Sequence, residues 1–194
     1  ELLQGSRKEQ RQLMGGCGDV FCMAVGTPIW PAPKEWQGAL LLLETSEEKP
    51  SPATLTYALR SLAAQGILRV ISGIVMGKPQ GEVYYEEYKQ VLLQVVAQEE
   101  GLRHLPILYN LNIGHAFPTG VLPLGVQAEI DCEAKPLTLL ESAPVAEGSP
   151  HHQKGQQPAR GGGEQQFKGG KPPLAVHLQE GNSPAPQQRR GERA

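Results

Sequence analysis

Glu44 and His115 are the two residues whose types and positions could carry out chemistry together. Glu44 ends the apolar run 39–43, and His115 follows the third expected strand, 107–110. If both segments are neighbouring parallel strands, the side chains follow carboxyl ends at one edge of the sheet, where active residues of open α/β sheets gather. A carboxylate that accepts a hydrogen bond from histidine Nδ1–H fixes the tautomer and leaves Nε2 free as a base.

The spacing of these two residues also fits a plainer interpretation, in which Glu44 is a solvated residue leaving a strand and His115 lies in a turn. The choice depends on the elements that position them. Residues 39–43 form a short apolar run after Gly38, which favours a strand buried on both faces. Ser51 and Pro52 predict the N-cap and first turn of a helix that Gly66 ends.

The middle of the chain alternates between strand and helix patterns. After the first strand and helix we expect a strand region over 67–76, a helix over about 83–99 and a strand over 107–110. This alternation predicts right-handed βαβ crossovers and a largely parallel sheet covered by helices. Further short strands are expected, with a turn at 131–135 between the last two: 20–25, 121–124, 127–130 and 137–140.

Composition bounds the class of protein. The chain has 194 residues and a formal net charge of −2, which excludes a strongly basic nucleic-acid binder as the default. The longest unbroken apolar run, 39–43, is far shorter than the roughly 20 residues of a membrane span. Three cysteines fit a reducing compartment better than a disulfide framework, so we expect a cytoplasmic protein without nucleic-acid or membrane partners.

The chain divides into three parts by composition. Residues 1–14 are polar and poorly patterned, and we interpret them as the remnant of an interdomain linker. Residues 15–143 have the size of an ordinary domain. In residues 144–194, Gly, Pro and Gln supply 24 of 51 positions, and such a segment buries too little apolar surface to offset its ordering entropy. We predict a low-complexity, disordered tail there.

Other motifs give weaker signals. The segment 73–79 resembles a phosphate-binding loop, but its glycine spacing is one residue short and Pro79 stands where Ser or Thr is needed. Cys17, Cys22 and Cys132 could be three metal ligands, although the first two are further apart than usual zinc pairs, and buried reduced thiols are the simpler interpretation. His104 fits a solvated loop, and His151–His152 lie in the low-complexity tail. We therefore expect neither a metal nor a cofactor.

Five stretches in register resemble the C-terminal domain of the LD-carboxypeptidases, closest to the branch that includes the microcin-immunity carboxypeptidases. The resemblance covers roughly residues 12–143. Its pieces are Gly26-Thr27-Pro28 with Trp36 to Glu44, Leu59 to Gly66, Ser72 to Lys78, Asn112-Ile113-Gly114-His115 and Leu122 to Gly125. It implies a compact α/β domain of the swivelling β/β/α kind, with a βαβαβ core and a terminal β-hairpin.

The resemblance also implies an activity. The family is one of serine hydrolases with a Ser-His-Glu triad. The resemblance implies that Glu44 corresponds to the Glu of this triad and His115 to its His. It hydrolyses the bond before a terminal D-amino acid in cytoplasmic murein peptides, and relatives cleave peptidyl-nucleotide antibiotics. Homodimers are usual in the family. The resemblance thus implies a peptide substrate and a homodimeric partner, without a metal.

This sequence departs from the family in one respect that bears on activity. The nucleophilic Ser of the family lies in a separate N-terminal domain on a sharp strand-to-helix turn, and no G-x-S-x-G elbow occurs here. We therefore expect the chain to supply only Glu44 and His115 and to be inactive alone. The alternative is a truncated, non-catalytic interaction domain that pairs with itself or with a full-length relative.

Overall fold

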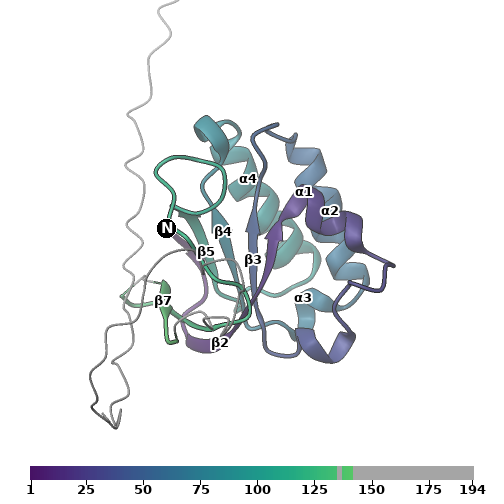
Figure 1. Cartoon of the computed structure of the whole chain (residues 1–194), viewed down its shortest axis with the longest axis vertical. Coiled ribbons are helices and arrows are strands. Elements are labelled where there is room, and N and C mark those ends of the chain that lie inside the picture. The colour runs from purple at the N-terminus through teal and green to yellow at the C-terminus, as the bar shows by residue number, and fades with distance from the viewer. Residues whose placement is uncertain (135–136, 142–194) are drawn as a thin grey trace, which may run out of the picture.

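The computed structural model describes residues 1–134 and 137–141, which form one curled, seven-stranded mixed sheet packed against helices (Figure 1). The strand order is β1-β5-β4-β3-β2-β6-β7, in which β5, β4, β3 and β2 run parallel and the outer pairings are antiparallel. The strands are β1 (Leu2–Gln4), β2 (Lys8–Cys17), β3 (Leu40–Glu44), β4 (Gly73–Gly77), β5 (Ile107–Leu111), β6 (Gln127–Asp131) and β7 (Leu137–Leu139).

The helices follow the strands in the order that a parallel sheet requires. Helix α2 lies between β3 and β4. Helix α4 and the π-helix η4 that continues it lie between β4 and β5. The Ser51 hydroxyl accepts a hydrogen bond from the Thr54 backbone N–H, and Gly66 has a left-handed φ of 76° where α2 ends. The helices are α1 (Gly18–Phe21), η1 (Cys22–Ala24), η2 (Pro33–Trp36), α2 (Pro52–Ala64), α3 (Ile67–Val70), η3 (Gln80–Glu82), α4 (Tyr85–Leu92) and the π-helical η4 (Leu93–Glu99).

Strand β3 lies at the centre and divides the core into two clusters. Leu41 and Leu43 pack with the buried faces of α2 and α4. Leu40 and Leu42 point the other way, into a second cluster with residues of β6 and β7. Because side chains alternate along a strand, Glu44 continues the Leu40–Leu42 face. The apolar run thus contributes side chains to both hydrophobic clusters, and it places the Glu44 carboxylate at the carboxyl end of β3.

The predicted fold class is confirmed: an α/β domain with a βαβαβ core and a terminal hairpin, here β6 and β7. The expected strands 39–43 and 107–110 and the helices after Ser51 and after residue 83 all form, with ends shifted by a few residues. The described part of the expected turn at 131–135 also forms, with Asp131 Oδ1 accepting hydrogen bonds from the backbone N–H groups of Glu133 and Ala134.

Two of the expected strands are wrong, and a third is shorter than expected. Residues 20–25 are helical, because β2 already ends at Cys17 and Phe21 turns inward to stack on Trp30 and Trp36. The segment 67–76 contains the short helix α3 before β4 begins. Residues 121–124 form a loop without a strand, and Val121 in it is 91% exposed.

Residues 1–14, which gave no strand pattern, contain β1 and most of β2. The polar side chains of β2 pair with those of β6: the Lys8 ammonium lies 2.8 Å from a Glu129 carboxylate oxygen, and Gln10 donates to the other oxygen of Glu129. This strand therefore crosses the boundary predicted at residues 14 and 15, while the division into domains stays a prediction. The predicted tail 144–194 lies outside the described residues, and within the described part no helix is long and apolar enough to cross a membrane.

Candidate active site at the carboxyl ends of the parallel strands

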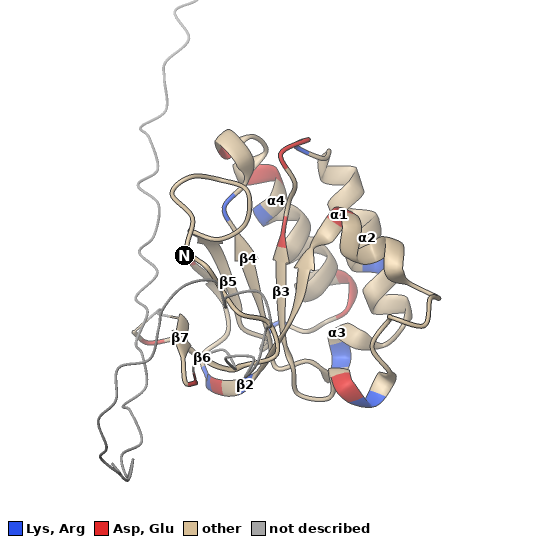
Figure 2. Cartoon of the chain, in the orientation of Figure 1, with Lys and Arg blue, Asp and Glu red and all other residues tan. Residues whose placement is uncertain are grey.

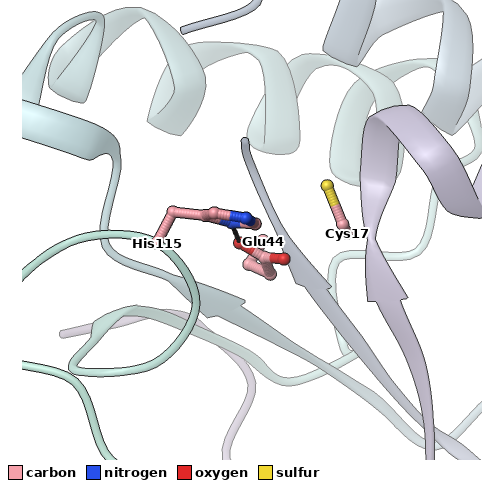
Figure 3. Close-up of side chains that lie close together, drawn as sticks. All are labelled: Cys17, Glu44 and His115. Atoms are coloured by element: carbon pink, nitrogen blue, oxygen red, sulfur yellow. Dashed lines mark hydrogen bonds and ion pairs between the residues drawn. The ribbon is translucent and has the colours of Figure 1, made fainter. Parts of the chain in front are cut away.

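Three neighbouring parallel strands end at the same level of the sheet. Cys17, Glu44 and Gly77 are the last residues of β2, β3 and β4, and Cys17 is the direct partner of Glu44 in the β2–β3 register. His115 enters this edge from the loop that follows β5. Figure 3 shows the side chains of Cys17, Glu44 and His115 close together there, with Glu44 and His115 in direct contact.

The structure brings the two sequence-predicted residues into direct contact. His115 Nδ1 lies 2.7 Å from Glu44 Oε2, across 71 residues of chain. Glu44 is buried, whereas 39% of the His115 side chain is exposed. A buried acceptor thus orients a ring whose other side can reach solvent or a substrate, which is the arrangement of an orienter and a general base.

Two glycines make the close approach possible. At Gly114, with a φ of 86°, an added Cβ would lie 2.4 Å from Glu44 Oε2. At Gly77 an added Cβ would lie 2.8 Å from the Ile113 carbonyl oxygen and 3.0 Å from Glu44 Cβ. Both positions exclude a larger side chain because the loop of His115 is packed directly onto the ends of β3 and β4.

The loop that carries His115 is held by hydrogen bonds on both sides of the histidine. Buried Lys78 donates from Nζ to the Phe117 carbonyl oxygen at 2.6 Å, and its backbone N–H donates to the Leu111 carbonyl oxygen at 2.8 Å. The Thr119 hydroxyl donates to the Gly114 carbonyl oxygen at 2.9 Å. Lys78 is therefore a positioning residue that sequence reasoning missed, because its neighbourhood was considered only as a phosphate loop.

The loop after β3 contributes a second carboxylate. His115 Nε2 lies 3.1 Å from Glu47 Oε2, and the Glu47 side chain is 63% exposed. The loop is fixed at its far end by buried Tyr88, whose hydroxyl donates to the Pro50 carbonyl oxygen, and burial raises the pKa of Tyr88 to about 12. Acidic side chains accordingly mark the end of β3 and the loop after it (Figure 2).

The acidic surroundings favour the charged form of the histidine. The hydrogen bond that His115 donates to Glu44 raises the pKa of His115 above its ordinary value of 6.5, and the negative charges of Glu44, Glu47 and Asp19 act in the same direction. Burial raises the pKa of the Cys17 thiol, so this cysteine is held as a neutral thiol. The ring nitrogen that would accept a proton becomes available as the pH rises through the pKa of His115.

The three-cysteine metal site considered from the sequence is not assembled in residues 1–134 and 137–141. There, Cys17 groups with Glu44 and His115 instead: one possible ligand atom from each residue lies within 4.8 Å of the others. Sequence spacing relates Cys17 only to the other cysteines, and no local signal links it to an acid and a histidine far along the chain. The segment 73–77 is strand β4, and His151–His152 lie outside the described residues.

The family described as the LD-carboxypeptidase C-terminal domain matches residues 10–130. These residues include both members of the Glu44–His115 pair and most of the sheet that positions them. The chain therefore belongs to this family of serine peptidases, as the sequence resemblance implied. No curated protein matches the chain.

Solved structures agree with this assignment. An MccF-like protein from Streptococcus pneumoniae, solved in complex with AMP, is 34% identical with a TM-score of 0.63 over 72% of this chain and 43% of its own. Microcin C7 self immunity protein MccF, solved with aspartyl sulfamoyl adenosine, is 25% identical with a TM-score of 0.57 over 72% and 40%.

A third structure, the MccF-like protein from Bacillus anthracis str. Ames, is 24% identical with a TM-score of 0.58 over 70% of this chain and 41% of its own, and it supports the fold alone. The chain thus spans about two fifths of the length of the structures that it matches.

Proposed function

We propose that this chain supplies the base and its orienting carboxylate to a serine-type LD-carboxypeptidase reaction. The observation that carries the proposal is the 2.7 Å contact between His115 Nδ1 and buried Glu44. In this mechanism Nε2 takes the proton from a serine hydroxyl on a nucleophile domain that is not among the described residues. The serine oxygen attacks the carbonyl before the terminal residue, and Glu44 stabilises the imidazolium that forms.

Exposed apolar side chains beside the site support the docking of a second domain that supplies the nucleophilic serine. Apolar side chains are exposed in two segments beside the site. One segment follows Cys17 at the end of β2, and the other is the loop after β5 that carries His115. Val20 and Met23 are 62% and 76% exposed, and Phe117 and Val121 are 85% and 91% exposed. Exposed apolar groups on both segments fit a docked nucleophile domain.

We also propose that the chain forms a homodimer and that it is located in the cytoplasm.

The substrate that we propose is a murein peptide with a terminal D-amino acid, or a related peptidyl conjugate. The second class is supported by the relatives, since one was solved with AMP and another with aspartyl sulfamoyl adenosine. The exposed carboxylate of Glu47 lies 3.1 Å from Nε2, and it must leave that nitrogen when the serine hydroxyl arrives. The assembled pair favours this enzymatic role over a purely non-catalytic interaction domain.

The test combines this chain with the portion of the Streptococcus pneumoniae relative that it does not cover, as a fusion. The assay follows release of D-Ala from a murein tetrapeptide and cleavage of aspartyl sulfamoyl adenosine. The chain alone should release nothing. The fusion should be active, and Glu44→Gln or His115→Ala should each lower kcat by roughly 10⁴-fold.

Two results would contradict this role. One is release of D-Ala by the unfused chain that His115→Ala abolishes, because the chain would then contain its own nucleophile. The other is fusion activity that survives both substitutions. A Glu47→Gln fusion serves as the matched control for Glu44→Gln, because Glu47 contacts the same ring from the exposed side, and it should retain most of the activity.

A further inference from the structure

Cys17, Glu44 and His115 present three chemically different donor atoms to one point. A thiol sulfur, a carboxylate oxygen and an imidazole nitrogen lie within 4.8 Å of one another at the sheet edge. Tetrahedral zinc with bonds of about 2.0–2.3 Å holds such donors about 3.5 Å apart. The three side chains are therefore within about an ångström of the separations that a zinc ion imposes.

The charges and the outer shell of this cluster also suit a metal. A thiolate and a carboxylate cancel the charge of Zn²⁺, and together with neutral imidazole they are the three kinds of side chain that bind zinc in proteins. Cys17 and Glu44 are fixed by strand register, so two of the three donors are already aligned. A zinc-bound histidine normally donates its other N–H to a carboxylate, and Glu47 Oε2 already lies 3.1 Å from His115 Nε2.

From this geometry we propose that Cys17, Glu44 and His115 form a Zn²⁺ site, with Cys17 Sγ, a Glu44 oxygen and His115 Nδ1 as ligands and a fourth position open to solvent. Binding displaces the thiol proton to the buffer, together with the imidazolium proton when His115 is charged. When His115 is charged, the hydrogen on Nε2 remains there. When the ring is neutral and carries its hydrogen on Nδ1, that hydrogen moves to Nε2, and in both cases it faces Glu47.

This site has a consequence for the reaction, which rests on the proposed function. Zinc on Nδ1 separates His115 from Glu44 and leaves the hydrogen on Nε2, so the ring can no longer accept a serine proton. Zinc would therefore inhibit the hydrolase. The metal site itself does not depend on hydrolysis, and it can be tested on the chain alone.

The binding test is calorimetric titration of the reduced, metal-free chain with ZnCl₂, and optical titration with CoCl₂. One equivalent should bind, with a thiolate-to-cobalt charge-transfer band in the near ultraviolet. Cys17→Ala and His115→Ala should each weaken zinc binding by more than about 100-fold, since loss of an outer-shell partner alone costs 10–100-fold. Cys17→Ala should also abolish the charge-transfer band.

Cys22→Ala is the matched control, because Cys22 is also half-buried and lies five residues further along, outside the cluster. It should bind zinc as tightly as the wild type, as should His151→Ala/His152→Ala. The proposal is overturned if the chain does not bind zinc, if Cys17→Ala binds as tightly as the wild type, or if either control loses the site. Zinc binding without inhibition of the active fusion would contradict the proposed role of His115 and leave the metal site standing.

Discussion

The two ends of strand β3 differ in both shape and chemistry. Beside its amino end lies a cavity of about 450 Å³ without an ionisable side chain in its wall, lined by Trp30, Pro31, Pro33, Trp36, Gln37, Gln65, Gly66, Ile67 and Val70. At its carboxyl end Cys17, Glu44 and His115 meet on a partly exposed edge. The larger hollow and the reactive groups are thus at opposite ends of one strand.

This difference shows that the size of a hollow does not locate the chemistry. A large apolar pocket is the usual first hypothesis for a binding site, but it needs convergent polar groups to act on a substrate. Those groups lie where parallel strands end, because the backbone there leaves the sheet and its loops can bring distant residues together. The wall of the hollow at the amino end is built mainly from apolar side chains, and we expect its variants to change stability without changing the site.

The largest effect on stability should come from the aromatic wall of the amino end. Trp36 is 1% exposed and packs against Phe21 and Trp30 at centroid distances of 5.8 and 5.5 Å. Trp36→Ala should lower the free energy of unfolding by about 3–5 kcal/mol, measured by urea titration. The pKa of His115 in the remaining folded protein should not change.

Trp36→Phe keeps most of the packed ring and removes an indole N–H that has no hydrogen-bond partner among the described residues. It should cost less than half as much as Trp36→Ala, because the buried polar group is lost together with the smaller volume. A shift of the His115 pKa in either variant would show that the two ends of β3 are coupled.

A glycine at the carboxyl end should show the opposite pattern. Gly114→Ala forces a left-handed backbone on alanine and places Cβ against Glu44 Oε2. Gly125→Ala is the matched control, since its φ of 83° is similar and an added Cβ would meet only Gln12 Nε2 at 3.9 Å. We expect losses of about 2–3 kcal/mol for Gly114→Ala and about 1–2 kcal/mol for Gly125→Ala, measured by urea denaturation.

Only Gly114→Ala should also lower the pKa of His115, because only there does the new methyl group displace the Glu44 carboxylate. Equal losses and unchanged histidine titrations in both variants would mean that the close approach of Gly114 to Glu44 is not needed for the pair.

The smallest effect should come from the cap of helix α2, in the connection that follows the carboxyl end of β3. Ser51 accepts the Thr54 backbone N–H at 3.4 Å, a long hydrogen bond. Ser51→Ala should therefore lower stability by about 1 kcal/mol or less, measured by thermal unfolding. A loss as large as that of Trp36→Ala would show that the helix start contributes more to the sheet ends than its contacts indicate.

Local sequence signals predicted the elements whose own residues mark where they begin and end. Ser51, Pro52 and Gly66 mark a helix by their side chains, and the apolar run 39–43 marks a buried strand. Residues 8–14 gave no such signal, since their polar side chains are matched by partners on β6 more than 110 residues away, as in the Lys8–Glu129 ion pair. The helical turn at 18–21 was missed because its apolar residues fit a strand equally well.

The part of the candidate site that depends only on the order and direction of the strands could be predicted from the sequence. Glu44 and His115 follow the parallel strands β3 and β5, whose carboxyl ends lie at one edge of the sheet. The two strands are not direct neighbours as expected, because β4 lies between them. The place of Cys17 depends on β2 pairing with β3 in a particular register, and that of Glu47 depends on the path of an exposed loop. Neither register nor loop path is encoded in residue spacing.

The most direct test of the Glu44–His115 pair is a titration of the His115 ring nitrogens by NMR, with a chelator present, in wild type, Glu44→Gln and Glu47→Gln. The raised pKa means that the folded chain holds this proton more tightly than the unfolded chain. The pair therefore stabilises the fold fully below about pH 6.5 and loses this contribution as the pH rises through the folded pKa.

We predict a pKa above 6.5 in the wild type, a neutral form with its hydrogen on Nδ1, a clear fall in Glu44→Gln and a smaller fall in Glu47→Gln. A wild-type pKa at or below 6.5 that Glu44→Gln leaves unchanged would contradict the pair.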